Sequence, residues 1–158
     1  MMNSLYQTVF EARMNQKLGI DLHFHPFDRF DRRVTKIDLG RQSGKTTAIL
    51  RTMMDNRKFD FILLTHSSHR AVELAEKYKA MFSLFKPIDE HKHRVIITGN
   101  TEMQIEKALN QSLRLHSDRS LIIFVEEGMN QTTKILTDLR ERLQDRERDF
   151  KIIVVGCQ

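Results

Sequence analysis

The chain has 158 residues, of which 40% are apolar and 30% charged, and this balance is typical of one globular domain with a single core. The net charge of +5 favours polyanionic partners such as nucleic acid, and the single cysteine, Cys157, excludes an internal disulfide and fits a reducing compartment. The first residues contain no long apolar run, so we expect neither a signal peptide nor a membrane span, and we expect a cytoplasmic protein.

In chain order, the first expected element is a helix, because Leu5, Val9 and Ala12 recur at helical spacing. An aromatic and basic segment, "DLHFHPFDRFDRR", follows at 21–33. Five short apolar runs then predict buried strands, because near-continuous apolar runs suit a sheet that is covered on both faces. They span 34–39, 59–65, 95–98, 121–125 and 152–155.

Helical patterns separate these strands. Thr101 with Gln104 forms a plausible capping box at the start of the third of these helical stretches. Strands that alternate with helices predict an α/β domain with a parallel sheet between two helical layers. The expected apolar helix positions are Ala48, Ile49 and Met53; Val72, Ala75, Tyr78 and Phe82; Ile105, Leu109 and Leu113; and Ile135, Leu139 and Leu143.

The stretch "GRQSGKTT", residues 40–47, joins the first predicted strand to the next helix. This is the context of a phosphate-binding loop, in which backbone N–H groups and a helix N-terminus surround the phosphates. Gly44 would allow the sharp turn, Lys45 would reach the β- and γ-phosphates, and the Thr46 hydroxyl would bind Mg²⁺. The strict motif has glycine where Leu39 stands, so a turn without ligand is the alternative.

The fourth predicted strand ends in two carboxylates, Glu126 and Glu127, in "LIIFVEE". Parallel strands place this end at the same sheet edge as the glycine loop. Glu126 can hold Mg²⁺ through water, and Glu127 can orient and deprotonate the attacking water. An acidic pair alone often marks a solvated turn, but together with the loop it favours a nucleotide site.

The loop and "FVEE" together resemble the additional-strand, catalytic-glutamate class of P-loop NTPases, and the loop is most similar to that of phage terminase large subunits. The resemblance implies one P-loop NTPase domain over 1–158, with an N-terminal helix and aromatic-basic segment at 1–32 and an ATPase core at 33–158. It implies a sheet order of 1-5-4-2-3, ATP as the nucleotide, a possible phage origin, and Arg41 acting in cis on the γ-phosphate. The implied nucleotide-binding residues are Gly40, Arg41, Gln42, Ser43, Gly44, Lys45, Thr46, Thr47 and Gln158.

The stretch "FILLTHSSHRAVELAEKY" resembles the second motif of superfamily 1 and 2 helicases, in which a loop touches the nucleic-acid backbone. Two residues depart from the family pattern, since Glu126 replaces the usual Asp and Gly128 replaces a common Ala. The sequence ends after the fifth predicted strand, so nuclease and translocation activities are not implied, and a fragment or a stand-alone protein are both open. The residues expected at the nucleic-acid loop are Thr65, Ser67, Ser68, His69 and Arg70.

Three further patterns have a simpler and a sharper interpretation. Phe24, Phe27 and Phe30 could stack on a base, but we expect them to cover the core. The pairs His23/His25 and His91/His93 could chelate zinc, but we expect surface histidines. The charged segment at 138–150 is expected to be a solvated helix face, and the alternative is an oligomer contact through Arg140, Arg142 or Arg146.

These features favour Mg²⁺-dependent ATP binding and hydrolysis by a domain that acts with nucleic acid, expected to be DNA, in packaging or remodelling. The catalytic candidates are Lys45, Glu127 and Arg41, and the Mg²⁺ ligands are Thr46 and Glu126. Two alternatives remain: a nucleotide-dependent module that binds nucleic acid or protein with little turnover, and a structural or inhibitory protein that does not use nucleotide. A homo-oligomer or a larger motor assembly is possible, and no membrane partner is expected.

Overall fold

The computed structural model describes residues 2–18, 26–38, 44–85, 95–114, 119–126, 132–143 and 149–156. Their helices are α1 (Met2–Met14), α2 (Pro26–Arg33), α3 (Lys45–Asp55), α4 (Ser68–Phe85), α5 (Glu102–Arg114) and α6 (Thr132–Leu143). Their strands are β1 (Val34–Ile37), β2 (Asp60–Thr65), β3 (Val95–Gly99), β4 (Leu121–Glu126) and β5 (Phe150–Val155). None of these described helices is long and apolar enough to cross a membrane.

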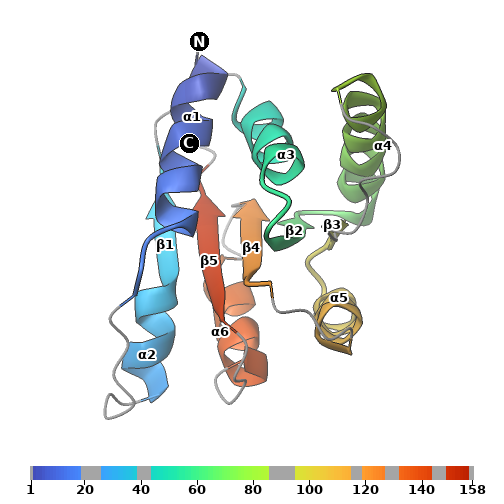
Figure 1. The fold of residues 1–158 in the computed structure, drawn as a ribbon. Coiled ribbons are helices and arrows are strands. Elements are labelled where there is room, and N and C mark those ends of the chain that lie inside the picture. Colours follow the sequence, from blue (N-terminus) through green and yellow to red (C-terminus); the bar gives the residue numbers. More distant parts are fainter. Residues whose placement is uncertain are drawn as a thin grey trace.

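The five strands form one all-parallel sheet in the order β1-β5-β4-β2-β3 (Figure 1). This confirms the predicted α/β class and the predicted strand order. In the register of the sheet, Ile123 of β4 lies between Ile62 of β2 and Ile152 of β5. The strands that are buried along their whole length, β2, β4 and β5, therefore occupy the centre, and the less buried β1 and β3 lie at the edges.

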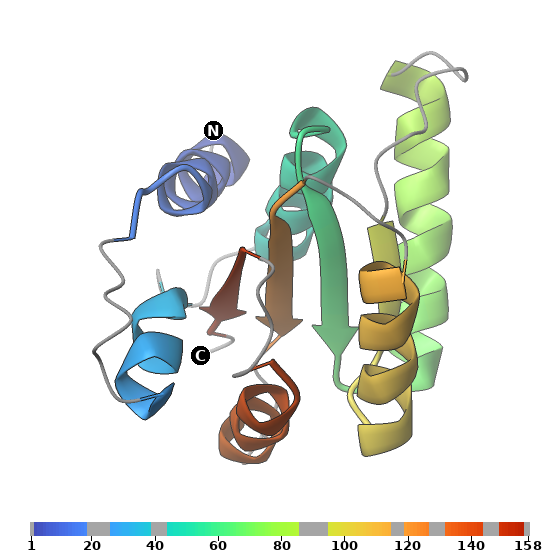
Figure 2. The same ribbon diagram turned by 60° about the horizontal axis from the view of Figure 1, so that its bottom comes forward.

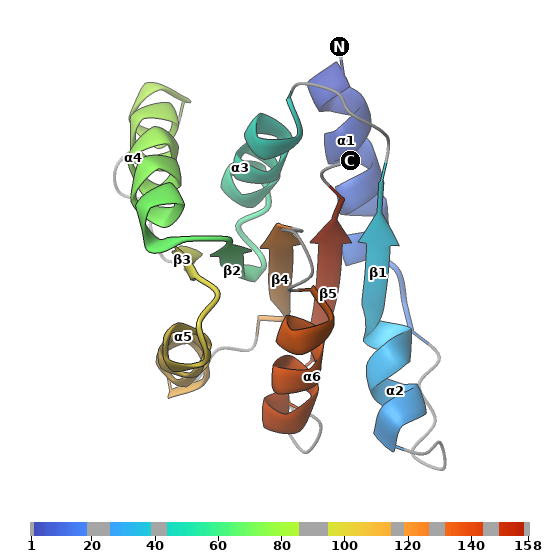
Figure 3. The ribbon, with the colours of Figure 1, turned by 180° about the vertical axis from the view of Figure 1, so that it is seen from behind.

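Helices cover both faces of the sheet, as the handedness of parallel crossovers requires. From β1 to β3 the chain crosses the sheet in one direction, and α3 and α4 pack on one face together with α1. From β3 to β5 the chain returns, so α5 and α6 pack on the opposite face together with α2 (Figures 2 and 3). Because of this reversal, α3, which follows β1, and α6, which follows β4, lie on opposite faces of the sheet.

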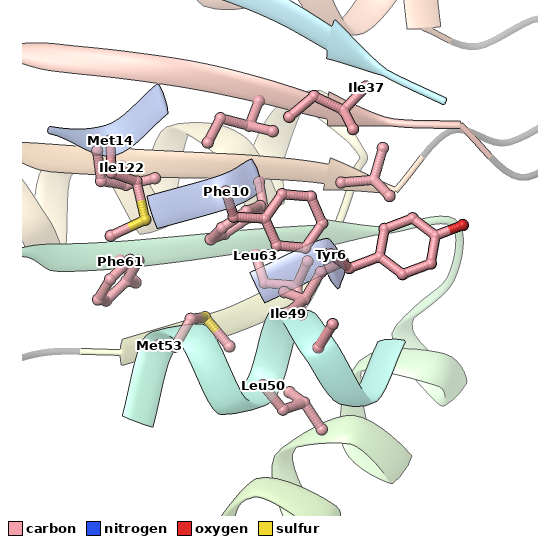
Figure 4. Close-up of a cluster of buried hydrophobic side chains, with 14 of the residues drawn as sticks. Tyr6, Phe10, Met14, Ile37, Ile49, Leu50, Met53, Phe61, Leu63 and Ile122 are labelled. Carbon is pink, nitrogen blue, oxygen red and sulfur yellow. The ribbon is translucent and has the colours of Figure 1, made fainter. Parts of the chain in front are cut away.

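The central strands alternate between two separate cores. On β4, Ile122 and Phe124 face the core under α1, α3 and α4, whereas Leu121, Ile123 and Val125 face the other. Figure 4 shows the first core, where side chains of α1 and α3 meet over the sheet. The labelled side chains there are Tyr6, Phe10, Met14, Ile37, Ile49, Leu50, Met53, Phe61, Leu63 and Ile122.

The predicted helix faces are confirmed for three helices as far as they are described. Every position expected in α3 and α6 is buried, as are Ile105 and Leu109 in α5, while the side chain of Leu113 lies outside the described part. The capping box of α5 is also confirmed. The Thr101 hydroxyl accepts from the Gln104 N–H at 3.2 Å, and Gln104 Oε1 accepts from the Thr101 N–H at 3.3 Å.

The predicted face of α1 is wrong at two of its three positions, because the helix is rotated relative to that expectation. Tyr6, Phe10 and Met14 are fully buried, whereas Leu5 is 48% exposed and Ala12 is exposed. Both sets have helical spacing, but the aromatic set buries more apolar area and therefore faces the sheet. Of the predicted positions, only Val9 packs against the core.

The predicted face of α4 is also partly wrong. Ala71 and Leu74 are buried and Tyr78 packs against the core, as does Met81, but Val72 is 58% exposed. Ala75 and Phe82 are half-buried, so of the predicted positions Tyr78 is the one that packs against the core. Burial raises the pKa of Tyr78 to about 12, consistent with a phenol that lies against the core.

Helix α2 was not predicted, although Pro26 stands at its first position, where proline favours helix initiation. Phe30 of α2 is buried and its ring lies 6.3 Å from that of Phe150, which confirms the expected core role for this phenylalanine. The side chains of Phe24 and Phe27 and both His-x-His pairs lie outside the described residues.

Helix α6 carries the first part of the charged segment. Nε of Arg142 lies 3.1 Å from both carboxylate oxygens of Asp138, and its Nη1 lies 3.7 Å from Glu106 of α5. These contacts join two helices of the same domain, so Arg142 belongs to an intramolecular network. Arg146 lies outside the described residues, and nothing in the described part tests an oligomer contact by Arg140.

Strand β5 begins two residues earlier than predicted, because Lys151 interrupts the apolar pattern. This lysine is buried, and its Nζ donates to the Met14 carbonyl at 2.6 Å, which joins β5 to the end of α1. Burial lowers the pKa of Lys151, Asp149 partly opposes that effect, and Arg13 and Arg33 lower the pKa further.

The lowered pKa of Lys151 predicts a pH-dependent stability. The unfolded chain keeps the proton up to about pH 10.5, and the folded chain releases it earlier, so the unfolding free energy rises with pH in the window below 10.5. Urea unfolding of the wild type and of Lys151→Met should show the wild type gaining stability relative to the variant from about pH 7 to about pH 10. A gap that is constant or moves the other way would contradict this assignment, since tyrosine ionisation is common to both proteins.

Candidate nucleotide-binding site

The predicted site residues that are described gather at the carboxyl edge of the sheet. Gly44, Lys45, Thr46 and Thr47 open α3, and Glu126 ends β4. The remaining predicted residues lie outside the described part of the chain, so their placement is untested. They are Gly40, Arg41, Gln42, Ser43, Glu127 and Gln158.

Gly44 shapes the start of α3. Its φ of 105° lies in the left-handed region that side chains rarely adopt, and its carbonyl accepts the first helical hydrogen bond from Ala48 N–H at 2.8 Å. No side chain caps the helix at this residue, so the N–H groups of the first turn point out from the positive end of the helix dipole. The turn therefore presents the backbone chemistry that anion binding needs.

The Lys45 side chain is mostly buried and crosses to the ends of β1 and β5. Its Nζ donates to the Gly156 carbonyl at 2.5 Å and lies 3.8 Å from Oδ1 of Asp38. A Cβ at Gly156 would come within 2.8 Å of Cγ of Asp38, so a larger residue there would have to displace the Asp38 side chain. The ammonium group is thus held beside the glycine turn with one carbonyl and one carboxylate as partners.

Thr46 and Glu126 are brought together around one side chain, that of Arg70. Nη2 of Arg70 donates to Thr46 Oγ1 at 3.0 Å and lies 3.5 Å from Glu126 Oε2. Nε of Arg70 lies 3.4 Å from Oε1 of the same carboxylate. Only 9% of the Glu126 side chain is exposed, so the charge of Arg70 offsets the cost of burying this carboxylate.

His66 is the second described partner of Glu126. It follows β2, the neighbour of β4 in the sheet, and its Nδ1 lies 3.1 Å from Glu126 Oε1. Glu126 therefore lies between an imidazole and a guanidinium, and both come from residues 66–70, which follow β2 and include the first turn of α4.

The residues that the helicase resemblance placed at a nucleic-acid backbone contact neighbouring residues of the same chain. Thr65 Oγ1 donates to the Ser67 carbonyl at 2.8 Å, and Ser68 Oγ accepts from Gln104 Nε2 at 2.6 Å. His69 is exposed and pairs with Glu73 on the same helix. Nothing in the structure tests whether they also contact nucleic acid.

Arg70 and His66 were missed as partners of the predicted metal ligands. The available signal was the strand order: β2 lies beside β4, so residues that follow β2 lie beside the residue that ends β4. A third contact was also missed, since Lys77 Nζ donates to Thr47 Oγ1 at 3.0 Å and joins α4 to the start of α3.

The donor set fits a hard divalent cation. Mg²⁺ is commonly held by one or two protein oxygens together with phosphate and water. Thr46 supplies a hydroxyl and Glu126 a carboxylate, and Nη2 of Arg70 lies within 3.5 Å of an oxygen of each. Among the described residues, no group of three or more His, Cys, Asp or Glu could hold a metal ion. A site completed by water, and by phosphate oxygens when nucleotide is bound, is therefore the arrangement that these residues could support.

A cavity of about 540 Å³ lies elsewhere, between the start of α5 and α6. Its lining includes Asn100, Lys134 and Asp138 and none of the predicted site residues. It is therefore not the predicted nucleotide site, of whose loop residues 40–43 lie outside the described part of the chain.

Comparisons with known proteins add no identification. The chain matches no model of a protein family, and no curated protein matches it. The case for function therefore depends on the residues at the sheet edge.

Proposed function

We propose that this domain binds ATP with Mg²⁺ and hydrolyses it. The observation that carries the proposal is the convergence of three chemically distinct groups at one sheet edge. A left-handed glycine opens an uncapped helix, Lys45 follows it at once, and Thr46 lies with Glu126 around a single guanidinium. An all-parallel sheet in this order binds ligands outside the carboxyl ends of its strands, which supports the same location.

Each described residue has a role that its chemistry supports. The first-turn N–H groups of α3 and the Lys45 ammonium would bind phosphate oxygens, because both offer donors and positive charge. To reach a phosphate, Lys45 would exchange its contacts with Gly156 and Asp38 for charge-assisted bonds to the ligand. Thr46 and Glu126 would hold the metal, which would neutralise charge on the phosphates.

The hydrolytic step requires a base and a group that stabilises the developing negative charge. Glu127 directly follows Glu126 in the chain and is the proposed base, which would take a proton from the attacking water. Arg41 is the proposed stabiliser of charge on the γ-phosphate. Both roles come from the sequence and from its resemblance to P-loop ATPases, and both residues lie outside the described part of the chain.

The proposal includes action on nucleic acid, supported by the net charge of +5 and by the resemblance to terminases and helicases. The second candidate is a nucleotide-dependent binding module. It is favoured by one observation: Lys45, Thr46 and Glu126 all have intramolecular partners, so nucleotide binding would have to rearrange the site.

Phosphate release from ATP separates these functions. We expect release that requires Mg²⁺, increases on addition of duplex DNA and is lost in Lys45→Ala but not in Lys107→Ala, whose exposed lysine lies on α5. Saturable ATP binding without release would favour the binding module. If the protein neither binds nor hydrolyses ATP, the domain keeps this fold for a structural or inhibitory role.

A further inference from the structure

The side chain of Arg70 occupies the space between the two proposed metal ligands. It belongs to the first turn of α4, where its own N–H donates to Ser67 Oγ at 3.1 Å and so fixes the start of the helix. From there its guanidinium reaches Thr46 on α3 and Glu126 on β4. One side chain therefore joins three elements that meet at the candidate site.

The contacts of Arg70 use the same atoms that a metal ion would use. Thr46 Oγ1 accepts from Nη2, and both oxygens of Glu126 lie within 3.5 Å of a guanidinium nitrogen. A divalent cation coordinated by these oxygens would need their lone pairs and would be repelled by the adjacent positive charge. The guanidinium and the metal therefore cannot occupy these contacts at the same time.

We propose that Arg70 is a built-in competitor of the divalent cation. With no metal bound, it holds Thr46 and Glu126 together and neutralises a carboxylate that is 9% exposed. Metal binding requires it to leave. Departure is feasible because the Arg70 side chain is 31% exposed, so the guanidinium can turn to solvent without unpacking α4. The inference rests on the proposed function for the identity of the metal site, but the competition concerns only residues of this chain.

The competition predicts a specific gain on removal of Arg70. In Arg70→Ala the oxygens of Thr46 and Glu126 lose their cationic partner, so a divalent cation should bind more tightly, by about fivefold to tenfold for a partly exposed charge-assisted contact. The matched control is Arg51→Ala, which removes the same charge from the exposed side of α3, where Arg51 pairs with Asp55. The control should leave the affinity for the cation unchanged.

The test is a titration of the full chain with Mn²⁺ in the absence of nucleotide, in which electron paramagnetic resonance counts the free ion. The expected result is one Mn²⁺ bound more tightly by Arg70→Ala, and also by Arg70→Gln, than by the wild type or Arg51→Ala. Circular dichroism checks that each variant is folded, and Arg70→Gln keeps a hydrogen-bonding side chain if the alanine variant does not fold. Equal or weaker Mn²⁺ binding by the folded Arg70 variants would overturn the proposal.

A parallel titration with ATP keeps this inference separate from the proposed function. If ATP binds to the wild type but the Arg70 variants gain no Mn²⁺ affinity, Arg70 is not a competitor and the nucleotide site is retained. If the variants gain Mn²⁺ affinity but ATP does not bind to any of the proteins, the competition is supported and the proposed function fails.

Discussion

Replacing Glu127 by glutamine is expected to lower the rate of ATP hydrolysis by about 10²- to 10⁴-fold, because an amide cannot accept the proton of the attacking water. Glutamine has nearly the shape of glutamate, so Mg²⁺·ATP affinity should stay within about twofold of the wild-type value. Single-turnover phosphate release measures the rate, and equilibrium titration measures the affinity. The two together separate a chemical role from a binding role.

The matched control is the neighbouring carboxylate. Glu126→Gln removes the proposed metal ligand and the charge that pairs with Arg70, so it should weaken metal-dependent binding as well as turnover. If Glu127→Gln hydrolyses ATP at the wild-type rate, Glu127 is not the base. If both variants lose affinity equally, the division of roles between the two residues is wrong.

Replacing Phe124 by alanine is expected to lower the free energy of unfolding by about 3–5 kcal/mol, the range for buried phenylalanine. The ring is fully buried on the central strand β4. It meets Phe10 of α1 edge-on at 5.3 Å and stacks on Phe61 of β2 at 6.1 Å between centroids. Truncation would open a cavity where α1 packs on the sheet, and the surrounding strands could close it only in part.

Urea unfolding followed by circular dichroism measures this loss. The control is Leu84→Ala on α4, where a side chain that is 79% exposed should change stability by less than about 0.5 kcal/mol. A loss below about 1 kcal/mol for Phe124→Ala would mean that α1 is not held against β4 as described.

The sheet could be predicted from the sequence because its signal is local. Runs such as 121–125 are apolar at every position, and that pattern suits a strand buried on both faces whichever side chain faces which core. The start of β5 was missed for the same reason: Lys151 breaks the run, and only its contact with the Met14 carbonyl explains its burial.

Which face of a helix is buried depends less on the local sequence, and two helices show this. In α1 both Leu5 with Val9 and Tyr6 with Phe10 have helical spacing. Which pair faces the core depends on which one fits over Phe124. In α4 the exposed Val72 is more apolar than the buried Ala71, so the position of α4 over the sheet decides which one is covered.

The candidate site likewise has one part that the local sequence predicts and one part that it does not. Gly44, Lys45 and Thr46 are contiguous, so their shared position follows from one motif. Arg70 and His66 reach Glu126 across 56 and 60 residues of sequence, and only the adjacency of β2 and β4 in the sheet brings them together. Composition and spacing contain no information about that contact. The predicted strand order placed the two segments side by side, but only the structure shows that the Arg70 guanidinium reaches both Thr46 and Glu126.

Equilibrium binding of Mg²⁺·ATP tests the central claim most directly. Isothermal titration should show one saturable site in the wild type, an affinity at least about tenfold weaker in Lys45→Ala, and no change in Lys107→Ala. This is expected because Lys45 alone combines a mostly buried ammonium group with a position directly after the left-handed Gly44. Equal affinity in the wild type and Lys45→Ala, or no binding to the wild type, would contradict an ATP site at this edge of the sheet.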